Sequence, residues 1–439
     1  MDYPLPVEIL RSAQKVAEQA EVFWVSSQET QVRFEANHLK EIQNKESTAV
    51  ALRIIKEGKI GFAVSSGGEV EDLIDEALET SQFGLPAKFQ FPFSKNYPEV
   101  SIFDPEMEKI TMEKMIELGN QLIAKVRGHT PEISCDVEVT KGTSSIRIIN
   151  SQGGEVGYDK SFFSLGLEGI LVQDKDMLFV GDEERTCRLL LGTDNLADRV
   201  IRQLELAKDK AAVSTKLLPV IFTPHGVASA LLIPITLAFN GKMVFEGTSP
   251  LKDKTGKQIF DEGLNLWDDA TIAYGIGSRP CDDEGVPSQR LSLITNGVVS
   301  NFLYDLQTAA LAGTRSTGHG KRAGSAFPRP AISSLIMEEG KVSFQAMVED
   351  MKEGLIVEEL IGAGQGDVLS GDFGGNVLLG YKVENGKIIG RVKDTMIAGN
   401  VYQVLKEHLD IGNEARWVNG ILRVPHLYCP RISVAARER

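Results

Sequence analysis

Residues 223–245, TPHGVASALLIPITLAFNGKMVF, are the stretch around which the rest of the chain is organised. Residues 217–222, LLPVIF, run straight into it and are typical of a short buried strand. Thr223 is suited to cap a helix that has Pro224 at its first position. The following residues are almost all apolar, and a helix that is apolar on every side is normally buried. The stretch therefore predicts a buried helix with His225 at its mouth and no acidic residue in its body.

Composition places the chain among soluble globular proteins and excludes several functional classes. Its 439 residues predict two domains, and its formal charge of −14 argues against direct nucleic-acid binding. No apolar run is long enough to span a bilayer, and the N-terminus has no secretory pattern, so we expect a cytoplasmic protein without membrane contact. The four cysteines have no metal-binding or disulfide spacing and are interpreted as reduced structural thiols.

The first half predicts an α+β domain over residues 1–215, with antiparallel strands and flanking helices. Residues 1–83 and 105–213 share a coarse order of helix, strands and helix, which suggests an internal duplication. The intervening residues 84–104 are rich in proline and lack any period, as in a linker or an irregular crossing. Residues 133–140 and 144–150 are interpreted as two strands joined by a turn at Lys141-Gly142, and residues 197–213 as a helix.

The second half, residues 216–439, predicts a mostly β domain around the buried helix. Short apolar segments flank Asn-Gly pairs at 296–297, 385–386 and 419–420, and each pair favours a type I′ hairpin turn. A further helix is expected near residues 399–409. No phosphate-binding glycine motif is present in a strand–loop–helix context, and no nucleophilic triad can be proposed from spacing.

Four segments, in this order along the chain, resemble the TldD/PmbA family, whose members have been called modulators of DNA gyrase and are viewed as metallopeptidases. They are residues 36–63, 280–305, 316–322 (STGHGKR) and 383–414. The resemblance implies one of two kinds of subunit. The TldD kind carries a zinc-binding HExxxH helix and a further cysteine ligand near its C-terminus, whereas the TldE (PmbA) kind lacks the motif and pairs with the first.

The helix at residues 224–239 lacks the chemistry that this motif supplies. A zinc peptidase needs imidazole ligands, a metal-bound water and a nearby carboxylate to take the proton. Here Gly226 follows His225, Ala230 stands five residues on, and no His, Glu, Asp or Cys occurs from residue 226 to 240. Cys429 lies in PHLYCPRISV and is interpreted as a buried thiol. The chain thus resembles the TldE kind, and we assign it no metal and no catalytic residue.

Two groups of residues remain as candidates for binding, one basic and one acidic. Five basic side chains are candidates for contacting a peptide substrate: His225 at the helix mouth, and Arg315, His319, Lys321 and Arg322 in the glycine-rich loop GTRSTGHGKR. Alternatively, His225 is a capping or surface residue and the loop is only solvated. Residues 282–284, Asp-Asp-Glu, could bind a hard cation, but a solvated turn is the expected state.

The function that the resemblance implies is that of a metal-free subunit in a cytoplasmic metallopeptidase complex. A TldD-like HExxxH partner would hold the zinc and cleave unfolded or flexible peptides, while this chain shapes the cavity and binds substrate. We expect a dimer, homomeric in isolation or heteromeric with that partner. The alternative is a non-catalytic homodimeric protein that binds peptides or regulates a partner, including gyrase, through protein contacts.

Overall fold

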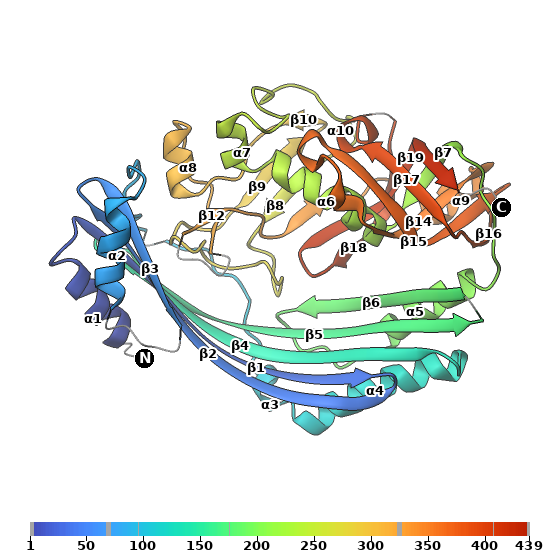
Figure 1. Cartoon of the computed structure of the whole chain (residues 1–439), viewed down its shortest axis with the longest axis horizontal. Coiled ribbons are helices and arrows are strands. Elements are labelled where there is room, and N and C mark those ends of the chain that lie inside the picture. The colour runs from blue at the N-terminus through green and yellow to red at the C-terminus, as the bar shows by residue number, and fades with distance from the viewer. Residues whose placement is uncertain are drawn as a thin grey trace.

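The computed structural model describes residues 4–66, 72–94, 96–174, 176–322, 327–406 and 408–436. The architecture is α+β, with strands dominating, as the sequence predicts. Figure 1 shows a long, curved sheet from the first half of the chain lying beside a β-rich second half. No helix among these residues is long and apolar enough to cross a membrane.

Six antiparallel strands form the sheet of the first half, in the order β3-β2-β1-β4-β5-β6. Their bounds are β1 (Gln19–Glu35), β2 (His38–Lys56), β3 (Lys59–Ser66), β4 (Ser134–Asn150), β5 (Glu155–Gln173) and β6 (Asp176–Thr186). The two groups of three strands meet where β1 pairs with β4. Whether this repetition reflects an internal duplication stays a hypothesis.

Helices cover this sheet near its two ends (Figure 1). The helices are α1 (Pro4–Ala13) and α2 (Leu73–Gln82) at one end, and α3 (Glu106–Lys109), α4 (Met112–His129) and α5 (Asp194–Leu206) at the other. Between them β1 carries the polar run Ser26–Thr30, whose residues are partly buried apart from the exposed Gln28. This polar stretch obscures the alternation by which strands are predicted from sequence.

The structure corrects two predictions about these strands. Residues 134–150 form one continuous strand, β4, so there is no turn at Lys141-Gly142. Gly142 occurs within the strand because the ring of Phe162 occupies its side-chain space, and a Cβ would lie 2.3 Å from that ring. The predicted helix at residues 197–213 is α5, which begins and ends earlier, and the sequence analysis did not foresee β6 before it.

In the second half, five strands pair in a closed ring. They are β7 (Lys216–Phe222), β14 (Glu353–Ile361), β15 (Asp372–Glu384), β17 (Thr395–Asn400) and β19 (Leu422–Ala436). Each pairs with the next in this order, and β19 closes the ring by pairing with β7. Outside the ring, β16 (Lys387–Arg391) pairs with β15, and β18 (Asp410–Val418) pairs with β19. A side branch runs through β13 (Leu335–Met337), β8 (Leu266–Asp269), β9 (Arg290–Thr295) and β10 (Val298–Val299).

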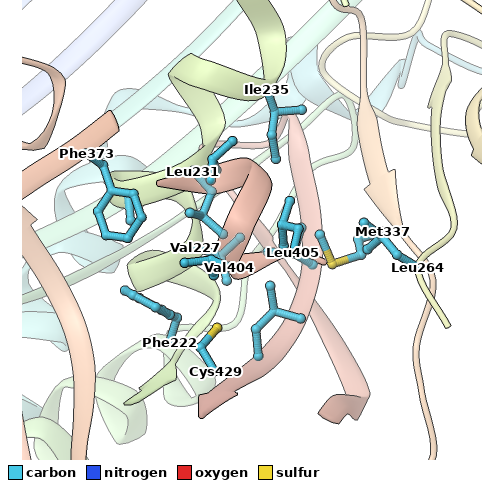
Figure 2. Packing of buried hydrophobic residues seen from close by; sticks show 14 of the residues in the cluster. Phe222, Val227, Leu231, Ile235, Leu264, Met337, Phe373, Val404, Leu405 and Cys429 are labelled. Carbon is cyan, nitrogen blue, oxygen red and sulfur yellow. The ribbon is translucent and has the colours of Figure 1, made fainter. Parts of the chain in front are cut away.

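Helix α6 (Pro224–Ala238) leaves β7 and packs against the apolar residues of this ring. Figure 2 shows Val227 and Leu231 of α6 grouped with Phe222, Phe373 and Cys429. All of these side chains are buried. The predicted helix is therefore confirmed and is mostly buried, although Ile233 is 47% exposed. The four cysteines are free, buried thiols, as interpreted from the sequence.

The hairpin predictions for the second half are also confirmed. At each Asn-Gly pair both residues have positive φ, between 47° and 75°, as a type I′ turn requires. The helix expected near residues 399–409 is shorter, however, and comprises only α10 (Val401–Val404). The remaining short elements are α7 (Gly241–Glu246), α8 (Leu306–Leu311), α9 (Phe344–Glu349), the 3-10 helices η1 (Ala363–Gln365) and η2 (Val368–Ser370), and the strand pair β11 (Gly320–Lys321) and β12 (Arg329–Pro330).

The two halves share a hydrophobic core. Alternate residues of the ring, among them Ile221, Ile356 and Tyr381, point away from α6 and join Leu118 of α4 and Leu204 of α5 in one buried cluster. Because the strands of the ring have apolar residues on both faces, they bind α6 on one side and the helices of the first sheet on the other. This arrangement brings His225, at the start of α6, next to Asp182 of β6.

Candidate functional site at the start of helix α6

The first turn of α6 is fixed by a cap and by close packing on β14. The Thr223 side chain accepts a hydrogen bond from the Gly226 N–H at 3.2 Å, which satisfies one of the free amides at the helix start. The Thr223 N–H in turn donates to the carbonyl of Val357 on β14 at 3.1 Å. These contacts hold His225 at the mouth of the helix, where its side chain is 21% exposed.

His225 forms an ion pair across the boundary between the two halves. Its Nε2 lies 3.2 Å from Oδ1 of Asp182 on β6, whose side chain is 1% exposed. Burial disfavours the imidazolium, but the hydrogen bond to Asp182 and its charge outweigh this effect and raise the pKa of His225. The pair therefore favours a charged histidine in the folded protein.

Two arginines complete the environment of Asp182. Its Oδ2 accepts hydrogen bonds from Arg199 of α5 and from Arg416 of β18, the latter at 2.7 Å. Its Oδ1 also accepts from the backbone N–H of Glu183 at 2.7 Å. Burial opposes ionisation of Asp182, but His225 and the two guanidinium groups lower its pKa below the usual range. One carboxylate is thus shared by three cationic side chains from both halves of the chain.

Two further titratable groups border this cluster. Glu358 occupies a β-bulge in β14, between Val357 and Glu359, and burial raises its pKa despite the nearby charges of His225 and Arg416. His426 of β19 packs on the ring of Phe344, with the ring centres 4.6 Å apart. Burial, Arg416 and Arg202 together lower the pKa of His426 to about 4, so this imidazole is neutral near pH 7.

The residues of α6 do not fit a zinc site of the HExxxH type. Gly226 stands where that motif has its glutamate, and a Cβ on Gly226 would lie 2.2 Å from the Val357 carbonyl oxygen. Ala230, at the position of the second histidine, is buried in the core. Burial also raises the pKa of the Cys429 thiol far above its usual value, which disfavours a thiolate ligand. Among the described residues, no three His, Cys, Asp or Glu side chains are grouped as a metal site.

The structure separates the four predicted binding residues of the glycine-rich loop. Arg315 and Lys321 are exposed. His319 is buried and lies 3.0 Å from Asp268 and 2.9 Å from the Thr317 hydroxyl. Arg322 donates to Glu21 on β1 and, through its backbone N–H, to Asp283 at 2.7 Å. Two of the four are therefore engaged by acidic side chains, His319 by Asp268 and Arg322 by Glu21, whereas His225 pairs with Asp182.

The acidic turn at residues 282–284 is not solvated, contrary to expectation. Asp282 and Glu284 are buried, and Glu284 accepts a hydrogen bond from Arg53 of β2 at 2.6 Å. Arg53 also donates to Glu21 at 3.1 Å and is flanked by the rings of Phe89 and Phe91. The turn therefore joins the C-terminal half to the first sheet. Its carboxylates are engaged by arginines and backbone amides instead of being free for a cation.

Sequence reasoning identified His225 but missed the residues that surround it. Asp182, Arg199 and Arg416 lie in three separate elements. In sequence, His225 is 43 residues from Asp182, and Arg416 is 234 residues from Asp182. No local pattern connects such distant positions. The one available signal was that β18 and α5 each carry an arginine in an amphipathic context, which is too common to indicate a site.

Two family models match this chain, one over the second half and one over part of the first half. The PmbA/TldA metallopeptidase C-terminal domain matches residues 215–436, and domain 1 of the same metallopeptidases matches residues 20–81. The chain belongs to the PmbA/TldD family. The resemblance noted from the sequence is thereby confirmed, and the helix whose mouth holds His225 lies within the matched C-terminal domain.

Relatives within the PmbA/TldD family match along almost the whole chain. An uncharacterised protein of Methanocaldococcus jannaschii is 28% identical over 417 residues, covering 92% of this chain and 94% of the relative. A metalloprotease of the same organism is 25% identical over 429 residues, covering 91% of each. The crystal structure of TldE from Thermococcus kodakarensis superimposes with a TM-score of 0.89 at 24% identity, covering 98% of this chain and 99% of the other. The last similarity shows the fold.

Proposed function

We propose that this chain is the metal-free subunit of a TldD/TldE-type metallopeptidase complex that cleaves unfolded or flexible peptides. In this proposal a TldD-like partner holds the zinc, and the present chain shapes the cavity and binds substrate. The observation that carries the proposal is the packing of Gly226, because the position that would bear the catalytic glutamate touches the backbone of β14.

Steric crowding at Gly226 supports the proposal of a chain built without the motif. A side chain at this position would have to displace β14 or the first turn of α6, since the obstructing atom is a backbone oxygen. β14 pairs with β7 and β15 within the ring, so it cannot move alone. The fold around α6 therefore favours a helix without the general base that zinc peptidases use.

The charges at the start of α6 also support a chain without a metal site there. The buried carboxylate of Asp182 is already neutralised by His225, Arg199 and Arg416. A divalent cation beside it would face two guanidinium groups and an imidazole whose raised pKa favours its protonated form. The cluster is instead suited to hold the two halves together and to present Arg416, whose side chain is 36% exposed, to an anionic or carbonyl group.

Strand addition offers a route by which this site could bind peptides of many sequences. Ala415–Val418 of β18 pairs with β19 on one side, and no described strand pairs with these residues on the other side. A peptide added here would use main-chain hydrogen bonds and would pass beside Arg416. His225 and the exposed Arg315 and Lys321 remain candidates for contact with the rest of the substrate.

Co-expression with an HExxxH paralogue tests the proposal. We expect the two chains to co-purify and to cleave a flexible peptide in a reaction that a chelator stops, whereas this chain alone is inactive. The matched control is a partner in which glutamine replaces the motif's glutamate, which should assemble but not cleave. The proposal is wrong if the isolated chain contains stoichiometric zinc and shows chelator-sensitive cleavage.

A further inference from the structure

Three side chains of the second half form a line of hydrogen bonds outside the cluster around Asp182. The Thr317 hydroxyl lies 2.9 Å from Nδ1 of His319, and Nε2 of His319 lies 3.0 Å from Oδ1 of Asp268. Thr317 and His319 precede β11, and Asp268 belongs to β8. A hydroxyl, an imidazole and a carboxylate in this order are the nucleophile, base and orienting group of many acyl-transfer enzymes.

The carboxylate of Asp268 determines which nitrogen of His319 carries a hydrogen. Asp268 is buried, and its two oxygens accept hydrogen bonds from the backbone N–H of Ser333 at 3.1 and 2.8 Å. Since an ionised carboxylate only accepts, Nε2 of His319 is assigned the hydrogen in the bond that joins them. In the neutral ring, Nδ1 then has a free electron pair beside the Thr317 hydroxyl.

Thr317 is more accessible than the base that it contacts. It is partly exposed, whereas His319 is 1% exposed. The Tyr304 N–H donates to Oγ1 of Thr317 at 2.8 Å and fixes its position. The hydroxyl proton has two acceptors, Nδ1 at 2.9 Å and the Tyr304 carbonyl oxygen at 3.3 Å, and the shorter contact favours the imidazole.

Gly318 makes the turn that brings Thr317 against His319. Its φ is 76°, and a Cβ at this position would lie 2.7 Å from the Pro287 carbonyl oxygen. Glycine is therefore required for the backbone between the hydroxyl and the imidazole. A side-chain donor also lies beside this turn, since Nε2 of the exposed Gln289 donates to the Thr317 carbonyl at 3.0 Å.

We propose that Thr317 is a nucleophile that takes an acyl group from activated esters and thioesters. Its Oγ1 attacks the carbonyl carbon while the hydroxyl proton passes to Nδ1 of His319. The bond to the leaving oxygen or sulfur then breaks, and the leaving group departs with the bonding electrons as a phenolate or thiolate. The product is an ester on Thr317. Asp268 is a positioning residue, because it acts only through His319.

The burial of His319 limits the acyl donors. An amide nitrogen must receive a proton before it leaves, and the general base usually returns it. With a side chain that is 1% exposed behind Thr317, His319 is not placed to reach such a nitrogen. Phenolates and thiolates leave without a proton. The site is therefore not a second peptidase centre, and this inference goes beyond the proposed peptidase role and needs no zinc-bearing partner.

Covalent labelling of the full chain tests the proposal. The chain is incubated with p-nitrophenyl acetate, or with the acetyl thioester of a small thiol, in the presence of a chelator, and the acetylated residues are mapped by mass spectrometry. Thr317 should be acetylated at least about a hundredfold faster than Thr314, which is exposed in the same loop. Thr317→Val should abolish the label at this position, and Thr317→Ser should retain it.

Two variants test the base and the residue that positions it. His319→Gln can keep a hydrogen bond to Asp268 but has no imidazole, so labelling of Thr317 should fall at least about a hundredfold while circular dichroism shows a folded chain. Asp268→Asn should lower the labelling rate and move the midpoint of its pH profile, which a packing defect alone would not do. An unlabelled Thr317 in the wild type, equal labelling of Thr314, or a folded His319→Gln variant labelled as fast as the wild type would each overturn the proposal.

Discussion

Replacing Gly226 with alanine measures how closely α6 is packed against β14. The added Cβ would lie 2.2 Å from the Val357 carbonyl oxygen and 3.2 Å from its carbonyl carbon. Normal contact requires the backbone to move by roughly 1 Å, and overpacking of this kind costs about 1–3 kcal/mol. Alanine is favoured over glycine in a helix by about 1 kcal/mol, so the net loss of stability should be about 0–2 kcal/mol.

Gly128 provides the matched control. It lies in α4, and no atom lies within 4 Å of the position its Cβ would take. Gly128→Ala should therefore leave stability unchanged or raise it by up to about 1 kcal/mol. Urea unfolding of both variants and the wild type, followed by circular dichroism, gives the comparison. If Gly226→Ala proved as stable as Gly128→Ala, the argument that this position excludes a side chain would be refuted.

Two further predictions concern the buried charges. Arg53→Met leaves two buried carboxylates without their partner and should lower the free energy of unfolding in urea by about 3–5 kcal/mol. Arg33→Met, at an exposed site, should change the free energy of unfolding by no more than about 0.5 kcal/mol. Equal effects of the two substitutions would contradict the ion-pair assignment. The raised pKa of His225 means that its pairing with Asp182 stabilises the fold below the ordinary histidine value and is lost as pH rises through the raised value. Relative to His225→Gln, the wild type should lose stability between pH 6 and pH 9, and a gain over this range would disprove the assignment.

Much of the second half could be predicted because its signals are local. The Asn-Gly turns require positive φ at adjacent residues, and both residues of each pair adopt it. The cap at Thr223 and the apolar body of α6 likewise depend on neighbours in sequence. The closure of the ring could not be predicted, because it depends on β19 pairing with β7 across more than two hundred residues.

Three predictions failed, each for its own physical reason. Period-two alternation is clear where one face of a strand is buried and the other is exposed, but the middle of β1 is polar and only partly buried. Glycine usually interrupts strands and therefore predicts a turn at Gly142, yet here the ring of Phe162 fills its side-chain space. The solvated interpretation of residues 282–284 failed because the arginine that pairs with Glu284 is 231 residues away.

The candidate site was only partly visible in the sequence for the same reason. His225 stands out beside a proline at a helix start, but its partner Asp182 and the two arginines come from distant elements. The absence of ligands along α6 was readable directly from the sequence. The structure adds that Gly226 is sterically required, which no pattern in the sequence could indicate.

The most direct test of the central claim is the zinc content of the complex formed with an HExxxH partner whose two motif histidines are replaced by alanine. If this chain contributes no metal site, the purified complex should contain no stoichiometric zinc and should not cleave peptides. The complex with the unaltered partner should contain one zinc per pair of chains. Stoichiometric zinc in the altered complex, together with chelator-sensitive cleavage, would contradict the account.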